Sequence, residues 1–244
     1  MNLSLCTLTG VDERSNLERI ANLSTQHGQA EWGFLYSPKL QGQPGRYPSV
    51  DFILHALDTL TPRANIALHV CGKGVTDLLD KEEVAQSLLV NVGKRAGGKR
   101  IQLNFNHLNK PIDVPALRNL ISENPTITFI TQQNEANAEL WLALEGLANH
   151  AVLFDASGGR GLSPDVWPAP MPISCGYAGG LGVGNIAAQL HALDSLAPHS
   201  SHWVDMEGSL RDVDQDGHDW LNLDRCEAVL ITSQEFTEAK KAQA

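Results

Sequence analysis

The sequence predicts the α/β fold class, and within it a single (β/α)8 TIM barrel over residues 1–244, from three observations. Short apolar runs with strand character alternate with amphipathic stretches along the whole chain. Eight such runs leave about 30 residues for each, the size of one βα unit. No linker rich in Ser, Pro or Gly divides the chain. An open doubly wound sheet is the alternative architecture.

The expected strands are apolar runs that are bounded by turn formers and are too short to be helices. They are Leu3–Cys6, Trp32–Tyr36, Ile66–Val70, Ile101–Leu103, Ile127–Thr131, Ala151–Phe154, Ile173–Tyr177 and His202–Val204.

The expected helices are the amphipathic segments between and after these runs. They are Glu13–His27, Val50–Leu60, Val75–Asn91, Val114–Glu123, Glu135–Ala148, Ile186–Leu196 and a last helix from about Trp220 to Ala239. We expect the tail, residues 239–244, to be frayed, as chain ends usually are.

Charge and cysteine usage restrict the partners. Eighteen Lys and Arg against 28 Asp and Glu give a net charge of −10, which argues against nucleic acid and anionic lipid. No apolar run reaches the roughly 18 residues of a membrane span, and no signal peptide is evident. Cys6, Cys71, Cys175 and Cys226 are widely spaced, which is typical of reduced thiols. We therefore expect a cytoplasmic protein, monomeric or homodimeric, with no membrane partner.

Two reactive side chains lie at the carboxyl ends of expected strands, which is the end of a (β/α)8 barrel that holds the active site. Cys6 could act as a base or nucleophile if its pKa is lowered, or could simply pack in the core. Asp155 leads into a glycine-rich loop, and burial there would raise its pKa toward that of a general acid. The alternative for Asp155 is a turn cap on Ser157 and Gly158.

Further candidates bind anions. Gly179 and Gly180 follow the seventh expected strand, and Gly208 and Ser209 follow the eighth, where such barrels often cradle phosphate on backbone amides. Ordinary turns are the alternative. Arg46, between Gly45 and Pro48, could hold a carboxylate with both ends of its guanidinium, or could be a solvated loop residue.

A short acidic motif suggests a cation site. Asp212, Asp214 and Asp216, followed by Gly217, match the first half of a calcium loop. The glutamate that should close such a loop is replaced by Leu223, so an acidic surface loop is the alternative. The histidines show no close metal-binding pairs, which argues against zinc.

Taken together, these segments resemble the phosphoribosylanthranilate isomerases, (β/α)8 barrels whose first strand leads into C-G-[IL]-T. The resemblance covers most of the chain in the family's order. The similar segments are Cys6-Thr7-Leu8-Thr9, Gly33-Phe34-Leu35-Tyr36, Gly45-Arg46-Tyr47-Pro48-Ser49, Ile101-Gln102-Leu103, Leu153-Phe154-Asp155 with Gly158-Gly159-Arg160-Gly161, and Ala178-Gly179-Gly180-Leu181 with Asn185-Ile186.

The resemblance implies an Amadori rearrangement of phosphoribosylanthranilate, or of a related aminoaldose phosphate, without a cofactor. It implies Cys6 as general base, Asp155 as general acid and Arg46 as the ligand of a carboxylate. Gln102 would join the substrate-binding residues. The phosphate would be held by Gly159, Gly180 and Ser209, with Arg160 supplying charge nearby.

The chain also departs from the family. Thr7 replaces the glycine after the cysteine, Asn104 replaces a histidine, and Glu207 would stand close to the phosphate. Cys71 and Lys73 have no counterpart in the family pattern, and Lys73 could be a new anion contact. The alternative functions are another phosphate-binding barrel enzyme, an epimerase or aldolase, and a catalytically silent barrel that binds a metabolite or a partner.

Overall fold

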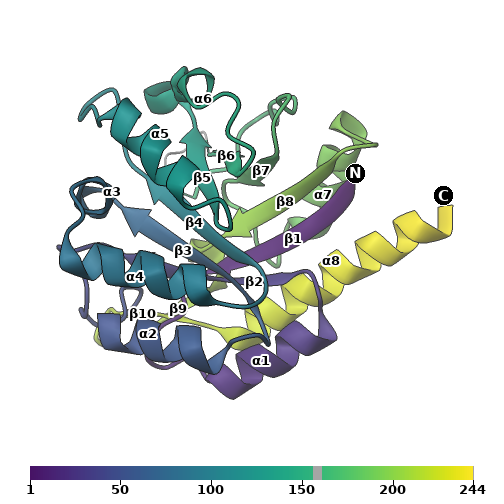
Figure 1. The fold of residues 1–244 in the computed structure, drawn as a ribbon. Helices are drawn as coiled ribbons and strands as arrows, with labels where there is room; N and C mark the ends of the chain where they lie inside the picture. The colour runs from purple at the N-terminus through teal and green to yellow at the C-terminus, as the bar shows by residue number, and fades with distance from the viewer. Residues whose placement is uncertain (156–160, 244) are drawn as a thin grey trace.

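The computed structural model describes residues 1–155 and 161–243, and its centre is a closed barrel of eight parallel strands (Figure 1). The barrel closes where β1 pairs with β8, with Cys6 opposite Val204. The predicted (β/α)8 barrel is therefore confirmed. The strands are β1 (Asn2–Thr9), β2 (Ala30–Tyr36), β3 (Asn65–Cys71), β4 (Lys99–Asn104), β5 (Thr128–Gln133), β6 (His150–Phe154), β7 (Cys175–Ala178) and β8 (Ser201–Met206).

Helices surround the barrel, and several begin at a polar cap. The side chains of Asn16, Ser49 and Asp113 accept hydrogen bonds from backbone N–H groups of the first turn of α1, α2 and α5. The helices are α1 (Leu17–Gln26), α2 (Val50–Thr59), α3 (Lys73–Leu79), α4 (Glu83–Lys94), α5 (Val114–Glu123), α6 (Leu140–Ala143), α7 (Ile186–Leu196) and α8 (Leu223–Gln243), with short 3₁₀ turns η1 (Glu135–Asn137) and η2 (Gly208–Leu210). No helix in the described part of the chain is long and apolar enough to cross a membrane.

Two expected helices differ from the structure. The stretch 75–91 is divided into α3 and α4, because Lys81 adopts a positive φ of 60° that a helix cannot contain. The stretch 135–148 holds only η1 and the four-residue α6. Among the described residues 161–174, between β6 and β7, there is no helix either, so the wall at β5 to β7 is mostly loop.

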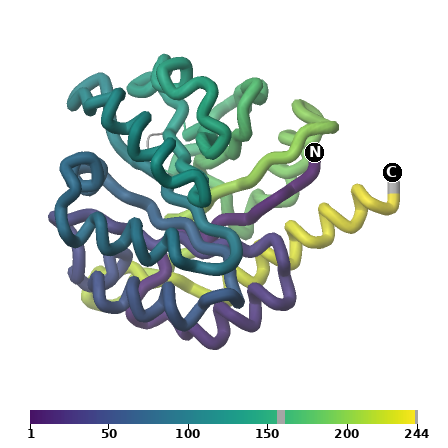
Figure 2. Tube along the Cα trace, in the orientation of Figure 1, coloured from purple at the N-terminus to yellow at the C-terminus, as the bar shows by residue number. Residues whose placement is uncertain are grey.

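The C-terminal part adds one element and extends another. A hairpin of β9 (Arg211–Val213) and β10 (Asp219–Leu221) stands where an acidic loop and the start of a helix were expected. α8 continues to Gln243, so the described part of the tail that was expected to fray is drawn as helix. Lys240 in this stretch pairs with Asp194 of α7 at 2.9 Å. The end of α8 extends past the barrel (Figure 2).

The strands bury side chains on both faces. Residues such as Cys6, Leu8 and Trp32 belong to the large core between the sheet and the helices. Inside the barrel, an apolar cluster contains Ile130, Ala151, Leu153 and Trp203. A Cβ on Gly176 would collide with the Trp203 indole, so β7 needs glycine there. Leu5 and Ala178, which are partly buried, pack against the same cluster.

Candidate functional site

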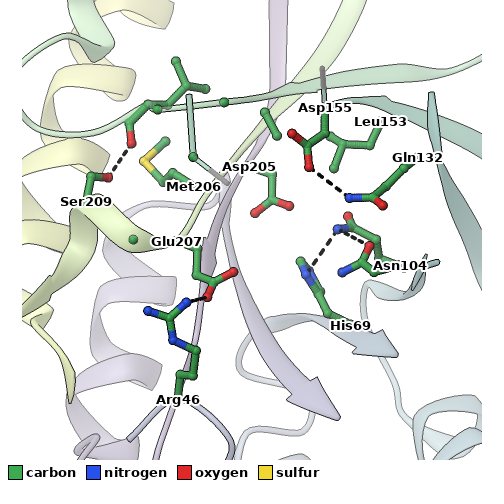
Figure 3. A pocket seen from close by; sticks show the side chains of 17 residues that line it. Arg46, His69, Asn104, Gln132, Leu153, Asp155, Asp205, Met206, Glu207 and Ser209 are labelled. Atoms are coloured by element: carbon green, nitrogen blue, oxygen red, sulfur yellow. Dashed lines mark hydrogen bonds and ion pairs between the residues drawn. The ribbon is translucent and has the colours of Figure 1, made fainter. Parts of the chain in front are cut away.

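A cavity of about 380 Å³ opens at the end of the barrel where the parallel strands finish. This is the end at which barrels of this type place their active sites. Its polar lining comes from strands, and from the segments that follow them, on opposite sides of the barrel (Figure 3). The polar side chains are Arg46, His69, Gln102, Asn104, Gln132, Asp155, Asp205, Glu207 and Ser209.

Asp155 lies in this cavity, as its position after an apolar run predicts. It directly follows β6 and is only 5% exposed. Nε2 of Gln132, from the neighbouring strand β5, donates a hydrogen bond of 2.9 Å to its Oδ2 atom. Figure 3 shows the carboxyl group directed into the cavity. The turn-cap alternative involves Ser157 and Gly158, which lie outside the described residues.

A second carboxyl group, Asp205, lies in the same cavity and was missed in the sequence (Figure 3). It sits on β8, on the far side of β7 from Asp155. Oγ1 of Thr9 donates a 2.7 Å hydrogen bond to its Oδ1 atom. Burial, with a smaller contribution from the nearby Asp155, raises the pKa of Asp205 to about 6 against the opposing effects of Thr9, Arg100 and Gln102. A carboxyl group with such a pKa is suited to proton transfer near neutral pH.

The sequence contained a signal for Asp205. It follows the apolar run 202–204 as directly as Asp155 follows 151–154. Because the ends of parallel strands meet at one edge of the barrel, two carboxylates in this position are expected to face the same space.

Cys6 is not among the residues that line the cavity, so the structure does not bring it to the same space as Asp155, as a general base would require. Its side chain is fully buried in the core outside the barrel, where Oγ of Ser233 in α8 lies 3.9 Å from its sulfur. Burial raises the pKa of the Cys6 thiol to about 12. A thiol in these surroundings is protonated and has no access to a ligand, so it packs as a small apolar side chain.

The side chain of Cys6 points to the other face of β1 from the one that a base in the cavity needs. Neighbouring residues of a strand point to opposite faces, so a residue one position along the strand points into the barrel where its neighbour points toward the helices. On β1 the inward residues are Thr7, which bonds Glu31, and Thr9, which bonds Asp205. The glycine that the isomerase motif places after its cysteine follows Thr9 in this chain, not Cys6. Gly33 on β2 leaves the space that the Thr9 side chain occupies.

Arg46 lines the cavity, as expected of a residue that holds an anion, but its guanidinium already has partners. Its Nη1 atom pairs with Oε1 of Glu207 at 2.7 Å, and its Nη2 atom pairs with Asp219 of β10. Burial raises the pKa of Glu207, and Arg46 opposes that rise. A carboxylate ligand would therefore have to share Arg46 with two acidic side chains.

The segments after β7 and β8, which are rich in glycine, form the other end of the cavity. Gly179, Gly180, Gly208 and Ser209 all line it, and Gly179 and Gly180 have positive φ values of 134° and 58°. No acceptor in the described part of the chain takes a hydrogen bond from the N–H of Gly180 or Ser209. Unpaired backbone N–H groups are the donors that bind phosphate in such loops. Gly159 and Arg160, the other two expected contacts, lie outside the described residues.

Gln102 is buried and lines the cavity floor. Its Nε2 atom lies 3.3 Å from Nδ1 of His69 and 3.1 Å from Oδ1 of Asn104. Burial lowers the pKa of His69 to about 4, so this imidazole is neutral at physiological pH. The three side chains present neutral polar groups to a ligand.

The calcium candidates do not form the loop that the motif predicts. Asp212 pairs with Arg225 at 2.5 Å, away from its two neighbours. Asp214 accepts hydrogen bonds from the backbone of Asp216 and closes the β9–β10 turn. Ligand atoms of Asp214, Asp216 and His218 lie within 4.8 Å of one another. His218 thus takes the place that the motif gives to Asp212 in a possible cation site.

Neither Cys71, the last residue of β3, nor Lys73, the first residue of α3, lines the cavity. Lys73 is 66% exposed and pairs with Asp77 one turn along α3, so it is not an anion contact in the cavity. Burial raises the pKa of Cys71 to about 12, and its thiol lies 3.6 Å from the carbonyl oxygen of His69.

Comparison with known proteins gives a fold relationship. No family model matches the chain, and no curated protein sequence does. Among solved structures, phosphoribosyl anthranilate isomerase from Thermus thermophilus has a TM-score of 0.60 at 15% identity, with 95% of this chain and 99% of that one covered. TrpF from Jonesia denitrificans has a TM-score of 0.58 at 14% identity, covering 94% and 96%.

A phosphoribosyl anthranilate isomerase solved with reduced 1-(o-carboxyphenylamino)-1-deoxyribulose 5-phosphate has a TM-score of 0.56 at 15% identity, covering 96% and 100%. At these identities the likeness establishes a shared barrel architecture over nearly the full length of the chain.

Proposed function

We propose that this protein is an isomerase that carries out an Amadori rearrangement of an aminoaldose phosphate, with phosphoribosylanthranilate as the first substrate to test. The observation that carries the proposal is the presence of two buried carboxyl groups, Asp155 and Asp205, in one cavity. The N–H groups of Gly180 and Ser209, which find no acceptor among the described residues, support a phosphorylated ligand at the other end. The fold shared with phosphoribosyl anthranilate isomerases agrees with it.

The two carboxyl groups divide the proton transfers. Asp155, in its protonated form, donates to the furanose ring oxygen while the C1–O bond breaks. The nitrogen lone pair then forms a C1=N iminium, and Asp155 is left as a carboxylate. Asp205 removes the proton from C2, and those electrons form a C1=C2 bond as the iminium nitrogen becomes a neutral amine. The resulting enol takes a proton at C1 from the protonated Asp205, after that proton has exchanged with solvent, and its C2 hydroxyl loses a proton as the C2 carbonyl of the aminoketose forms. The hydroxyl proton returns to the Asp155 carboxylate through solvent, so both groups regain their starting forms.

The pKa of Asp205 suits this assignment. With a pKa of about 6, Asp205 is ionised at neutral pH and is a stronger base than an ordinary aspartate. It thus takes the role that the resemblance gave to Cys6. Among the described residues that line the cavity there is no lysine, so an aldolase that uses a Schiff base lacks its amine here.

Turnover of phosphoribosylanthranilate by the purified protein tests the proposal. We expect Asp155→Asn and Asp205→Asn each to lower kcat by about 10²-fold to 10⁴-fold, as loss of a general acid or base does. The matched control is Asp51→Asn, on the exposed side of α2. Phosphate-dependent binding without turnover would instead favour a silent barrel, and turnover that survives both substitutions would refute the acid and base assignments.

A further inference from the structure

The barrel interior directly below the cavity contains an ion pair where such barrels usually have branched aliphatic side chains. Nη2 of Arg100, on β4, lies 2.6 Å from Oε1 of Glu31, on β2. Glu31 is fully buried, and the Arg100 side chain is 10% exposed. Oγ1 of Thr7 completes the group, 2.8 Å from Glu31 Oε1 and 3.2 Å from Arg100 Nη2.

The ion pair lies one inward layer below Asp205. Along β1, Thr7 contacts the pair, and the next inward residue, Thr9, bonds Asp205. Along β8, Trp203 is the inward residue before Asp205, and the Arg100 guanidinium lies 4.4 Å from the centre of its ring. The positive charge is thus fixed between β1, β2 and β8, beneath the carboxyl group proposed as base.

The pair is poorly explained as a stabilising contact. Oε2 of Glu31 and Nε of Arg100 are buried and have no hydrogen-bond partner in the described structure. Buried ion pairs gain little stability over apolar side chains of similar volume, because both charges lose their hydration. Apolar side chains would fill this layer equally well, so the pair is better explained by the chemistry above it.

We propose that Arg100 and Glu31 are positioning residues that hold a fixed positive charge beneath Asp205 and so set the pH range in which Asp205 is ionised. Arg100 favours the ionised carboxylate by direct attraction. Glu31 holds Arg100 in place and partly neutralises its charge. This inference rests on the proposed role of Asp205, but its test does not require turnover.

Other charged and titratable groups lie near Asp205 and are present in wild type and in every variant. The pKa of one of them, His69, also responds to Glu31 and Arg100, although burial is the largest cause of its shift. Asp155 on β6 raises the pKa of Asp205, and Glu207 at the end of β8 is a further acidic neighbour. His69 on β3 is neutral at physiological pH. The Cys6 thiol on the outer face of β1 is protonated.

The experiment follows the ionisation of Asp205 directly. Carboxyl ¹³C signals are titrated by NMR in protein labelled at aspartate, and the Asp205 signal is assigned by its loss in Asp205→Asn. Two variants change the charge below it: Glu31→Gln leaves Arg100 without its counter-charge, and Glu31→Gln with Arg100→Met removes both charges. The matched control is Glu18→Gln, which removes the carboxylate from an exposed pair with Arg63.

We expect the Asp205 midpoint to fall by about one pH unit in Glu31→Gln and to rise above the wild-type value in the double variant. The midpoint rises in the double variant because Arg100 is nearer to Asp205 than Glu31 is, so the loss of the positive charge outweighs the loss of the negative one. Glu18→Gln should leave the midpoint unchanged. Equal midpoints in wild type and in either folded variant would overturn the inference, because a purely structural pair changes stability alone. Shifted midpoints in a protein that fails to turn over an aminoaldose phosphate would refute the proposed function instead.

Discussion

Replacing Asp205 by asparagine should stabilise the folded protein at neutral pH while it removes activity. The pKa of Asp205 is about 6 in the folded protein, against an ordinary value of 3.8. The folded state therefore binds the proton more tightly than the unfolded state does, and stability falls as the pH rises from about 4 to about 6. One pKa unit corresponds to about 1.4 kcal/mol, so the ionised Asp205 costs about 3 kcal/mol at pH 7.

Urea unfolding at pH 4.5, 6 and 7.5 measures this cost. The amide that Asp205→Asn introduces keeps an oxygen that can accept the hydrogen bond of Thr9, so the substitution isolates the charge. We expect the variant to be more stable than wild type at pH 7.5 by up to about 3 kcal/mol, and the gain to shrink as the pH falls toward 4. Asp51→Asn, at an exposed position, should give no such trend. A gain that does not depend on pH, or a loss of stability at pH 7.5, would refute the reasoning.

Three further substitutions test other parts of the account. Cys6→Ala should keep turnover and lower the free energy of unfolding by about 1–2 kcal/mol, since it leaves a small void in the core; loss of turnover in the folded variant would restore the thiol as base. Gly180→Ala should weaken competitive inhibition by inorganic phosphate, because φ is 58° at this position and an alanine there strains the backbone that presents the N–H group. Gly184→Ala is the control: an added Cβ there meets nothing within 4 Å, and the inhibition should not change. Arg211→Met should lower the free energy of unfolding by about 3–5 kcal/mol, because it leaves the buried Asp12 without its cationic partner. The midpoint of thermal unfolding should fall accordingly, and an unchanged midpoint would contradict this.

The fold could be predicted because its signal repeats. Each expected strand coincides with an observed one, since a buried parallel strand appears as a short apolar run between turn formers. The hairpin β9–β10 could not be found in this way. Its strands have three residues each, and its turn is made by the acidic motif that also suggests a calcium loop.

The site was only partly predictable, because β1 is buried on both faces. Leu3, Leu5 and Leu8 give no alternation that separates the barrel interior from the helical layer, and the pairing with β8 shifts register between Leu3 and Leu5. The pattern of the chain therefore left the facing of Cys6 open. Asp155 could be predicted because its strand ends in a clear apolar run, and Asp205 has the same position after the run 202–204.

Exchange of the C2 proton of the substrate with solvent tests the central claim most directly. In D₂O, the wild-type protein should incorporate deuterium at C1 of the aminoketose product and lose the C2 proton of the aminoaldose, with a rate that falls below a pH of about 6 as Asp205 takes up its proton. Asp205→Asn should slow the exchange by about 10²-fold to 10⁴-fold, as it slows turnover, and Cys6→Ala should preserve the wild-type rate. Exchange that keeps the wild-type rate in Asp205→Asn and slows in Cys6→Ala would contradict the account.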